Sequence, residues 1–561
     1  MSVHIAFAIQ QLEASVQGIL TYQCTDHASP LCGAVEGTLQ GYTEAHSGGV
    51  YTARTLLLAY YTPGCRYEGD ALLLGRALLA LDYSLRREHG DGTFDLLETN
   101  FHDGAETSFI AQTICPIALL LRRHPPETEM ETEVHERLDR LISRITDGIV
   151  NGGFHTPNHR WVMSAALGMC HALTGRQECL DKMNALLREG IDCDAEGEYT
   201  ERSSGVYNII CDRALITLSE VCGLHGLLDH VTRNLRMVIK YFEPDLTVNT
   251  INSTRQDAGT APDWRIYYGL YLFMAMKTGD REFRWIADRM LEQSKSAFTW
   301  AARQSGQGMM PYFEYLPFVL TDSSLSDAWQ EIETSPPCFD FVQHFVSSGI
   351  VRARRGDTSL TLIRENPVFA MLKHRRHQLC LRLAGTFYSR GQFEAQEISE
   401  MPDGFELSFH NRWGYKGPLS EAPETSVWRL MDHSRRPDVM MQDYILRVQV
   451  KPISGGARFR ISAQGVENVL MKLEILLEGG ARYSTASTEM HTRPGDYIFQ
   501  KQGDAEYIYL DRTVLHIRGG SCTHLSGRAM RGTLPGNDSN VFIVLSAQTP
   551  WEQELELEFE G

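Results

Sequence analysis

The sequence predicts a multidomain protein of α and β structure, with an N-terminal α/α toroid or barrel followed by a C-terminal antiparallel β-sandwich. Apolar residues recur at helical spacing up to about residue 330 and at alternate positions after the Pro336-Pro337 pair. The length of 561 residues also exceeds what one ordinary core accommodates. We therefore expect a catalytic toroid at residues 1–335 and a sandwich at residues 336–561.

The helices of the first domain are predicted from five clear apolar segments of ordinary helix length. These are ARTLLLAYYT, ALLLGRALLALDYSLRRE, SFIAQTICPIALLLRRH, EVHERLDRLISRITDGIV and RWVMSAALGMCHALTG. Short breaks such as HGDGTFD and TDGIVNGGFHTPN separate them. A solenoid or a bundle gives the same succession of helical hairpins. The chemically mixed loops favour a toroid, in which the loops at one end build a site.

The strands of the second domain are predicted from alternating segments bounded by Gly, Asp and Pro turns. They are SGIVRARRGDTSLTLIRE, QLCLRLAGTFY, YILRVQVKPI, ARFRISAQG, YIFQKQGDAEYIYLD and NVFIVLSAQ. The sequence has neither the strand-helix alternation nor the G-x-G-x-x-G motif that would indicate a nucleotide-binding fold.

Composition excludes several classes of function. The formal net charge is −18 and 43% of the residues are hydrophobic, so the basic surface that nucleic acid requires is missing. Twelve cysteines without a C-x-x-C pair indicate buried thiols rather than disulfides or zinc, and we expect no metal and no cofactor. The N-terminus lacks a basic leader and no later stretch reads as a membrane span, so we expect a cytoplasmic protein.

Four polar clusters are candidates for chemistry, and the first is DLLETNFHDGAETSF. Asn100, His102, Asp103 and Glu106 crowd the start of a helix expected near Thr107. Helix capping explains one or two acidic residues there. It does not account for all four, so at least one of them is a candidate functional residue.

The second cluster is FHTPNHRWVMSAALG, in which His155, Asn158, His159, Arg160 and Trp161 open an apolar helix. A single histidine there would be structural, and Asn158 could be the N-cap. As a block, the amide and guanidinium groups suit a carboxylate and the indole suits a sugar ring. We therefore expect a substrate-binding role.

The third cluster is YTERSSGVYN at residues 199–208. Ser203 or Ser204 can cap the following helix, which places Tyr207 in its first turn and Glu201 in the loop before it. Both side chains can then face one cavity. The alternative is that Glu201 forms a local surface pair with Arg202.

The fourth cluster is NTINSTRQDAGTAPDW, where Arg255 can bind a carboxylate bidentately unless the loop is merely solvated. His344, near the domain junction, is a further candidate for reaching a cleft. His374 and His377 are expected on opposite faces at a basic sheet edge. No G-x-S-x-G elbow supports a serine hydrolase.

The layout, with Asn158-His159 opening one helix and Tyr207 opening a later one, resembles the heparinase II/III-like polysaccharide lyases. That resemblance implies that Asn158 and His159 neutralise a uronate carboxylate while Tyr207 moves the proton. The chain lacks a clear match for the histidine motif of their sandwich domain.

The phrases TNFHDGAETSF, TPNHRW and YTERSSGVYN more closely resemble glycoside hydrolase family 154, a β-glucuronidase family, and this resemblance ranks first. It implies acid/base hydrolysis in which Glu201 is the proton donor and Tyr207 orients it. The second carboxylate would be Glu106, with Asp103 and Asp257 as alternatives. The lyase is the second hypothesis and a non-catalytic carbohydrate-binding protein the third. The expected partners are a uronic-acid oligosaccharide and further copies of the chain. The catalytic candidates are Glu201, Glu106, Tyr207 and His159, and the substrate-binding candidates are Asn158, Arg160, Trp161, Arg202, Arg255, Asp103 and His344.

Overall fold

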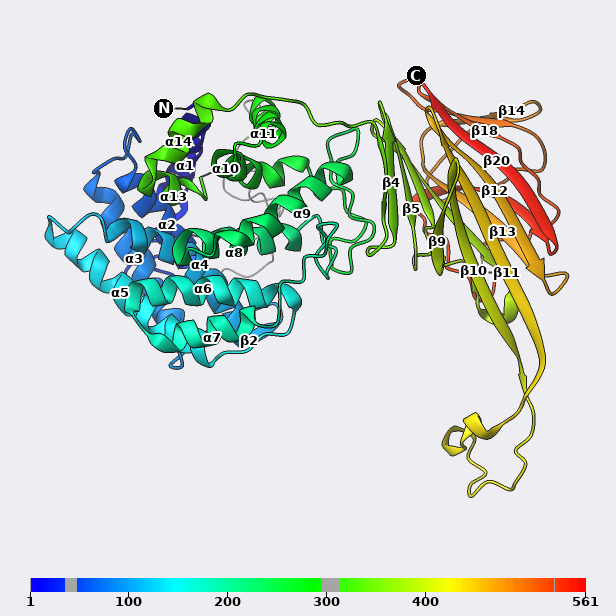
Figure 1. Ribbon diagram of the computed structural model, residues 1–561, viewed down its shortest axis with the longest axis horizontal. Coiled ribbons are helices and arrows are strands. Elements are labelled where there is room, and N and C mark those ends of the chain that lie inside the picture. The colour runs from blue at the N-terminus through cyan, green and yellow to red at the C-terminus, as the bar shows by residue number, and fades with distance from the viewer. Residues whose placement is uncertain (1, 36–47, 295–312, 529) are drawn as a thin grey trace. The chain divides into compact units, whose positions relative to one another are not determined.

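The computed structural model describes residues 2–35, 48–294, 313–528 and 530–561, and it divides into two compact units (Figure 1). Unit 1 comprises Met1–Tyr241 and Thr247–Pro337. Unit 2 comprises Phe242–Leu246 and Cys338–Gly561. The short segment Phe242–Leu246 belongs to unit 2, where both of its acidic side chains form ion pairs: buried Glu243 with Arg352 at 3.0 Å, and Asp245 with Lys373 at 2.7 Å.

Unit 1 is helical. Its helices are α1 (Val3–Tyr22), α2 (Gly48–Tyr61), α3 (Ala71–Arg87), α4 (Gly104–Leu121), α5 (Glu129–Asn151), α6 (Pro157–Thr174), α7 (Gln177–Leu187), α8 (Tyr207–Cys222), α9 (Leu228–Tyr241), α10 (Tyr268–Thr278), α11 (Arg281–Ser294), α13 (Leu316–Thr321) and α14 (Ser323–Glu331), with short 3-10 turns η1 (His225–Leu227) and η2 (Trp264–Tyr267).

Helix packing in unit 1 follows a two-layer pattern. The even-numbered helices pack in succession, α2 on α4, α4 on α6, α6 on α8 and α8 on α10, and each also packs against an odd-numbered neighbour. Nearly all of α4 and α6 is buried, whereas α5 and α9 bury one stripe and expose a charged face. This is the α/α toroid that the chemically mixed loops favoured over a solenoid or a bundle.

Two glycine contacts hold the connections at one end of these helices. The hairpin β1 (Phe94–Leu96) and β2 (Asn100–Asp103) precedes α4. A Cβ atom on Gly148 of α5 would lie 2.4 Å from the Gly92 carbonyl oxygen, and one on Gly104 would lie 2.9 Å from the Gly152 Cα. Glycine at these positions therefore lets the hairpin and the loop before α6 lie directly on the helices.

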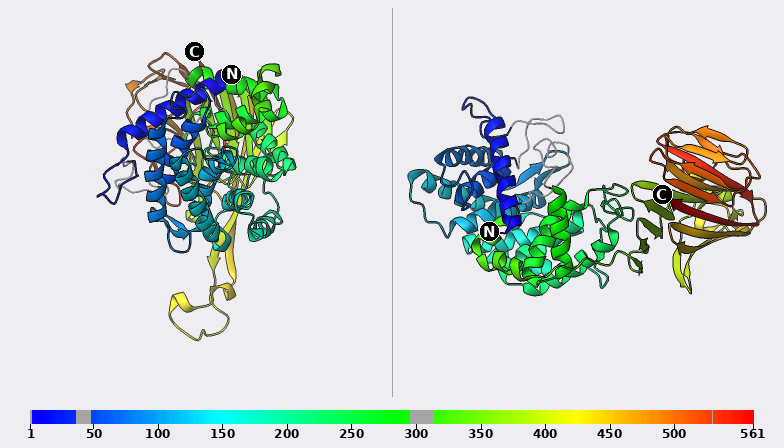
Figure 2. Two further views of the ribbon diagram at one scale, coloured as in Figure 1. Left: turned by 90° about the vertical axis from the view of Figure 1, so that its left-hand side faces the viewer. Right: turned by 90° about the horizontal axis from the view of Figure 1, so that it is seen from above.

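Unit 2 is the predicted β-sandwich, seen in two further views in Figure 2. One sheet has the order β15-β14-β17-β18-β20-β12-β11-β10-β9 and the other β16-β19-β13-β7-β6-β5-β4-β3, with β8 paired to β7. The strands are β3 (Phe341–Phe345), β4 (Ile350–Arg355), β5 (Thr358–Ile363), β6 (Ala370–His374), β7 (His377–Gly385), β8 (Gly391–Gln392), β9 (Glu397–Met401), β10 (Gly404–Lys416), β11 (Asp438–Ile453), β12 (Gly456–Gly465), β13 (Leu470–Glu478), β14 (Arg482–Thr485), β15 (Glu489–His491), β16 (Tyr497–Phe499), β17 (Ala505–Ile508), β18 (Val514–Arg518), β19 (Asn540–Gln548) and β20 (Trp551–Glu560).

The two sheets bury a common core. Leu381, Leu473 and Ile543 from one sheet belong to the same buried cluster as Leu446 and Ile461 from the other. Along β12 buried and exposed residues alternate, as the period of two requires when one sheet face is solvated. The predicted antiparallel pairing holds for all the ladders except that of β16 and β19, which is parallel.

Two sequence expectations need correction. Among the described residues, α4 is the one helix long and apolar enough, by length and composition, to cross a membrane, although 78% of that segment is buried within the protein. Burial in the toroid accounts for its composition. His374 and His377 do not lie on opposite faces of a sheet edge: they pair across the tight turn between β6 and β7, both strands are internal, and both side chains are buried.

Candidate functional site

Three helix starts of the toroid meet at one place. The carboxylate of Asp103 caps α4 by accepting a hydrogen bond from the Ala105 N–H at 2.8 Å, and α8 begins at Tyr207. Helix α6 begins at Pro157, and Thr156 before it makes no side-chain capping bond. Aligned peptide dipoles place partial positive charge at each start. The site is therefore electrostatically suited to a negatively charged group despite the acidic composition of the chain.

Glu201 occupies the unfilled start of α6. Asn158 Nδ2 donates to Glu201 Oε2 at 2.8 Å, and the Asn158 backbone N–H also donates to this carboxylate. Arg255 Nη1 lies 3.0 Å from Oε1, and Glu201 is only 5% exposed. Burial raises the pKa of the Glu201 carboxyl, although the Asn158 hydrogen bonds and the Arg255 charge oppose that shift. The local surface pair of Glu201 with Arg202 is not observed.

Arg255 connects this buried carboxylate to Tyr207. Its Nη2 donates to the Tyr207 hydroxyl at 3.3 Å, and its guanidinium lies 4.5 Å from the centre of the Tyr207 ring. The hydroxyl in turn donates to Gln256 Oε1 at 3.3 Å. Tyr207 is partly exposed, so its hydroxyl is accessible in a way that the Glu201 carboxylate is not. Arg255 thus pairs with a carboxylate of its own chain, and the expected bidentate binding of a substrate carboxylate stays a prediction.

His159 lies one residue beyond Asn158 and is also buried. Its ring packs edge-on against exposed His155 with centroids 4.9 Å apart, and 6.2 Å from the ring of Phe109 on α4. Burial, with a further contribution from His155, lowers the pKa of His159 to about 4. Near neutral pH the imidazole is therefore uncharged and acts as a hydrogen-bonding group rather than as a cation.

Asp257 braces the loop that presents Tyr207. It accepts hydrogen bonds from the Ser203 hydroxyl at 2.9 Å and from the Gly205 N–H at 2.9 Å. Ser203 Oγ then accepts from the Tyr207 N–H at 3.0 Å, although the N-cap position of α8 is Val206 rather than the predicted serine. Because its oxygens are committed to the loop, Asp257 serves to position the start of the helix.

A second buried carboxyl, Glu198, is absent from the sequence prediction. It accepts hydrogen bonds from Tyr241 at 3.0 Å and from Asn208 at 3.2 Å, while Asn252 donates to the Tyr241 hydroxyl. Burial raises the pKa of Glu198 to about 7. The signal in the sequence was a pair of polar residues one helical turn apart, Asn208 and Asp212, among the apolar residues of α8.

Other predicted residues are engaged elsewhere in unit 1. Arg160 pairs with Glu189 at 3.1 Å and lies over the Trp161 ring, which is fully buried and donates to Asp192 at 2.8 Å. Trp161 consequently offers no free ring face to a sugar. Glu106 lies in the first turn of α4, where its charge acts on the Tyr51 phenol.

The two remaining predicted residues are Arg202 and His344. Arg202 adopts a left-handed backbone conformation with φ 50° in the loop before α8, and its charge acts on Glu198. His344 lies on β3 of unit 2, where its Nδ1 is 3.3 Å from Glu400.

Exposed aromatic side chains flank the helix starts. Phe101 on β2 is 67% exposed, and Phe154 in the loop before α6 is 41% exposed. Both belong to the segments that the Gly104–Gly152 contact brings together. Exposed ring faces beside hydrogen-bonding groups are the combination that sugar rings require.

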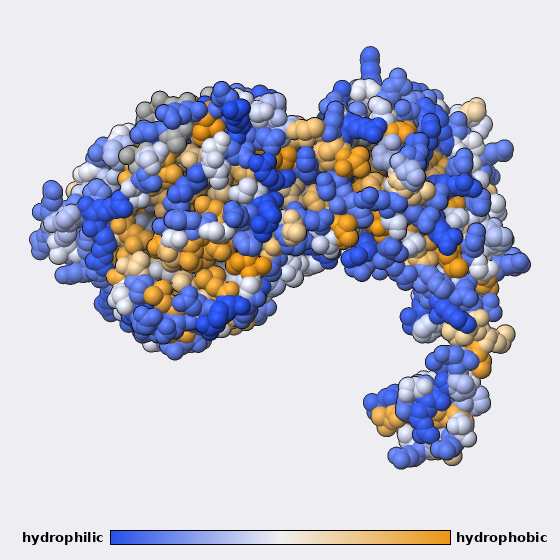
Figure 3. Space-filling model, in the orientation of Figure 1, coloured by the Kyte–Doolittle hydropathy of each residue, from blue (hydrophilic) through white to orange (hydrophobic). Residues whose placement is uncertain are grey.

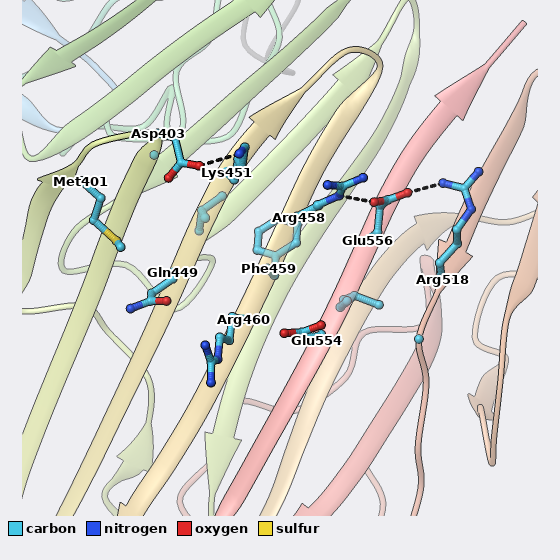
Figure 4. Close-up of a pocket in the computed structure, with 14 residues that line it drawn as sticks. Met401, Asp403, Gln449, Lys451, Arg458, Phe459, Arg460, Arg518, Glu554 and Glu556 are labelled. Carbon is cyan, nitrogen blue, oxygen red and sulfur yellow. Dashed lines mark hydrogen bonds and ion pairs between the residues drawn. The ribbon is translucent and has the colours of Figure 1, made fainter.

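Unit 2 carries a groove of about 740 Å³ on the solvent face of the sheet that contains β9–β12 (Figure 4). Its cations are paired within the sheet: Lys451 with Asp403, and both Arg458 and Arg518 with Glu556. Exposed ion pairs between neighbouring strands are common on solvated sheets and contribute little energy each. These three cations of the groove are therefore committed to acidic partners within unit 2.

The fold defined above can now be compared with known proteins. No protein-family model and no curated protein matches the chain. Three solved structures are similar. A Paenibacillus xanthan lyase is 9% identical with a TM-score of 0.54, and the match covers 99% of this chain and 57% of the lyase. Heparinase III is 10% identical with a TM-score of 0.55, covering 98% of this chain and 84% of that protein, and a heparan sulfate lyase from Pedobacter heparinus is 10% identical with a TM-score of 0.50, covering 93% and 78%.

At such low identity these likenesses establish the fold alone. The chain shares with all three the architecture of an α/α toroid followed by a β-sandwich, which confirms the predicted fold class. It spans just over half, 57%, of the xanthan lyase. The named resemblance to glycoside hydrolase family 154 stays a prediction.

Proposed function

We propose that the chain is a polysaccharide lyase that acts on a glycan containing uronic acid, with Tyr207 as the residue that moves the proton. The main supporting observation is the unequal access of the two candidate groups. Tyr207 is partly exposed, with a guanidinium 3.3 Å from its hydroxyl, whereas Glu201 is 5% exposed and held by Asn158 and Arg255. The lyase fold of the three structures is a second, weaker support.

In this proposal the reaction is a β-elimination. Tyr207, as the phenolate, takes the proton from the carbon next to the uronate carboxylate, and the glycosidic oxygen then departs as a carbon–carbon double bond forms. The same phenol returns the proton to the departing oxygen, so water is not consumed. The positive charge of Arg255 stabilises the phenolate on both sides of that exchange.

Recognition of the uronate is assigned to groups around the α6 start. His155 is exposed and contacts His159, whose neutral ring can donate one hydrogen bond. The start of α8, which contacts the neutral Ser203 hydroxyl rather than a carboxylate, favours the uronate electrostatically. Phe101 and Phe154 supply apolar faces for the sugar rings. Asn158 has a different role from the one expected, because its amide holds Glu201.

A β-glucuronidase is the second candidate function, and one observation favours it. Burial raises the pKa of Glu201, which is the environment that a general acid needs. Against it, Glu201 fills a helix start, where its carboxylate is hydrogen-bonded by Asn158 and paired with Arg255. A general acid must reach the glycosidic oxygen, and these contacts hold Glu201 within the protein.

The test is product analysis on polysaccharides and oligosaccharides that contain glucuronic or related uronic acids. The proposal predicts a product whose new double bond, conjugated to the carboxylate, absorbs ultraviolet light, and predicts none with the Tyr207→Phe variant. Release of saturated glucuronic acid without that absorbance would instead establish the glucuronidase.

A further inference from the structure

Exposed apolar side chains concentrate on one projecting segment of unit 2, residues 411–440, which we call the arm. It consists of the outer parts of β10 and β11 and the loop between them (Figure 1). Figure 3 shows hydrophobic residues on its surface. Of the nineteen large hydrophobic residues exposed in the described part of the chain, seven lie on the arm: Trp413, Tyr415, Val427, Trp428, Leu430, Val439 and Met440.

The arm is a two-stranded ribbon without neighbouring strands. β9 pairs with β10 only through Gly404–Ser408, and β12 pairs with β11 only from Tyr444 onward. Beyond these points the two strands pair with each other alone, as far as Lys416 opposite Asp438. Figure 2 shows the ribbon leaving the sheets of unit 2. At its base the ribbon contacts its own unit: the Arg390 guanidinium lies 3.7 Å from the centre of the Trp413 ring, and the Tyr388 and Tyr415 ring centroids are 5.4 Å apart. Farther out, two-stranded ribbons are marginally stable in water, so the exposed apolar side chains at the tip indicate a partner surface.

The tip of the arm has a fixed structure of its own. The ring centroids of Trp428 and His433 lie 4.3 Å apart, and the Arg436 guanidinium lies 4.8 Å from the Trp428 ring. The Gly417 N–H donates to the Pro437 carbonyl at 2.8 Å and closes the loop. Trp428 is nevertheless 65% exposed and Leu430 62% exposed. The tip therefore presents a preorganised aromatic and aliphatic pair to whatever it contacts.

Charge indicates what the partner is. The arm has five Arg or Lys and four Asp or Glu, a net charge of +1, in a chain whose formal net charge is −18. The rest of the chain therefore carries −19. Arg429, between Trp428 and Leu430, has no ion-pair partner among the described residues. A second copy of this chain presents the strongly acidic surface that such a tip complements.

We propose that the arm is a dimerisation element whose tip packs on the surface of a second copy of this chain, with the arm of that copy making the same contact in return. A two-fold axis relates the two contacts, so the same contact is made twice and the second arm doubles the buried area. The tip combines an aromatic anchor, which the contact would bury, with a flanking cation, as interface hot spots do: these are Trp428, Leu430 and Arg429. The inference is independent of the reaction class.

Sedimentation velocity of the full chain across a range of concentrations tests the proposal. The wild type should sediment as a dimer, and the Trp428→Asp/Leu430→Asp variant as a monomer. Leu510→Asp is the matched control, because Leu510 is 90% exposed but lies in unit 2 away from the arm. That control should remain dimeric.

A shortened arm guards against a misfolded tip. Replacing residues 417–437 with Asn-Gly joins Lys416 to Asp438 by a two-residue hairpin turn that matches their pairing. This variant should be monomeric, with a melting temperature close to that of the wild type. A wild type that is monomeric at every concentration, or a dimer that survives both changes, contradicts the proposal. A third result also contradicts it. If the wild type is a monomer and an immobilised uronic-acid polysaccharide retains the Trp428→Asp variant more weakly than the wild type, the tip is a glycan-binding platform.

Discussion

At the scale of single residues, Tyr207 and Glu201 compete for the same chemistry, and their environments differ in the one property that matters for a large substrate. The tyrosine hydroxyl is reachable and lies beside a cation. The glutamate is buried at the start of α6, where Asn158 donates a hydrogen bond to it and Arg255 pairs with its charge. The sequence placed both groups at one site and favoured Glu201 as the proton donor. It could not show that Glu201 is paired with Arg255, a contact across about fifty residues.

Tyr207→Phe removes the proton-carrying hydroxyl and retains the ring under Arg255. We expect a loss of about a hundredfold to ten-thousandfold in kcat, the usual worth of general acid–base catalysis, with little change in melting temperature. Glu201→Gln should lower the melting temperature because Arg255 loses its counter-ion, while kcat falls by less than about tenfold, roughly 1.4 kcal/mol. The reverse order of the two rates would assign the proton transfer to Glu201.

Glu198 predicts a pH dependence of stability. Its pKa in the folded protein is about 7, compared with an ordinary value of 4.5. Between these values the folded state holds a proton that the unfolded state releases, so this carboxyl contributes stability below about pH 4.5 that is lost as the pH rises through about 7. At 1.36 kcal/mol per pKa unit the contribution is about 3 kcal/mol.

Glu198→Gln should remove that contribution. The free energy of unfolding of the variant minus that of the wild type should increase as the pH is raised from about 5 to about 8, because only the wild type loses stability through Glu198. His159, with its lowered pKa, acts in the opposite sense in both proteins, so only the difference between them is informative. A difference that does not change with pH would mean that Glu198 is ionised in the folded protein at both ends of the range.

At the scale of elements, the helices and strands follow from hydrophobic period, and the connections between them do not. The predicted segments became helices α2–α6 and strands β4, β5, β7, β11, β12, β16, β17 and β19. Most of them bury the face that their pattern marks. In the sequence the hairpin β1–β2 appears only as a break between helices, because its apolar residues recur at no regular spacing. The site depends on these connections, and a close approach of two glycines is invisible to any single-segment pattern.

Gly104→Ala tests how that approach supports the site. The new Cβ would lie 2.9 Å from the Gly152 Cα, so the loop carrying His155 must shift. We expect a loss of about 1–3 kcal/mol in unfolding free energy, typical of overpacking, and reduced activity. Gly153→Ala is the matched control, because a Cβ atom at that position would have no neighbour within 4 Å, and its effect should be small. Equal losses in the two variants would show that the Gly104–Gly152 contact has no special role.

At the scale of the whole molecule, the order of a toroid and a sandwich was predictable because a change of period from 3.6 to 2 divides the chain. The arm was not, because a ribbon that projects from its sheet has the same alternation as one within it. Trp161 and Arg160 read as a sugar platform but are used in packing, since the sequence does not show which face of α6 contacts α7.

The central claim, elimination rather than hydrolysis, is tested most directly by digesting a uronic-acid oligosaccharide in water enriched in heavy oxygen and weighing the products. The account predicts fragments whose masses sum to that of the substrate, with no heavy oxygen incorporated during cleavage, because the proton moves through Tyr207 and water takes no part. Fragments that together exceed the substrate by one water, with heavy oxygen on the new sugar end, would contradict it.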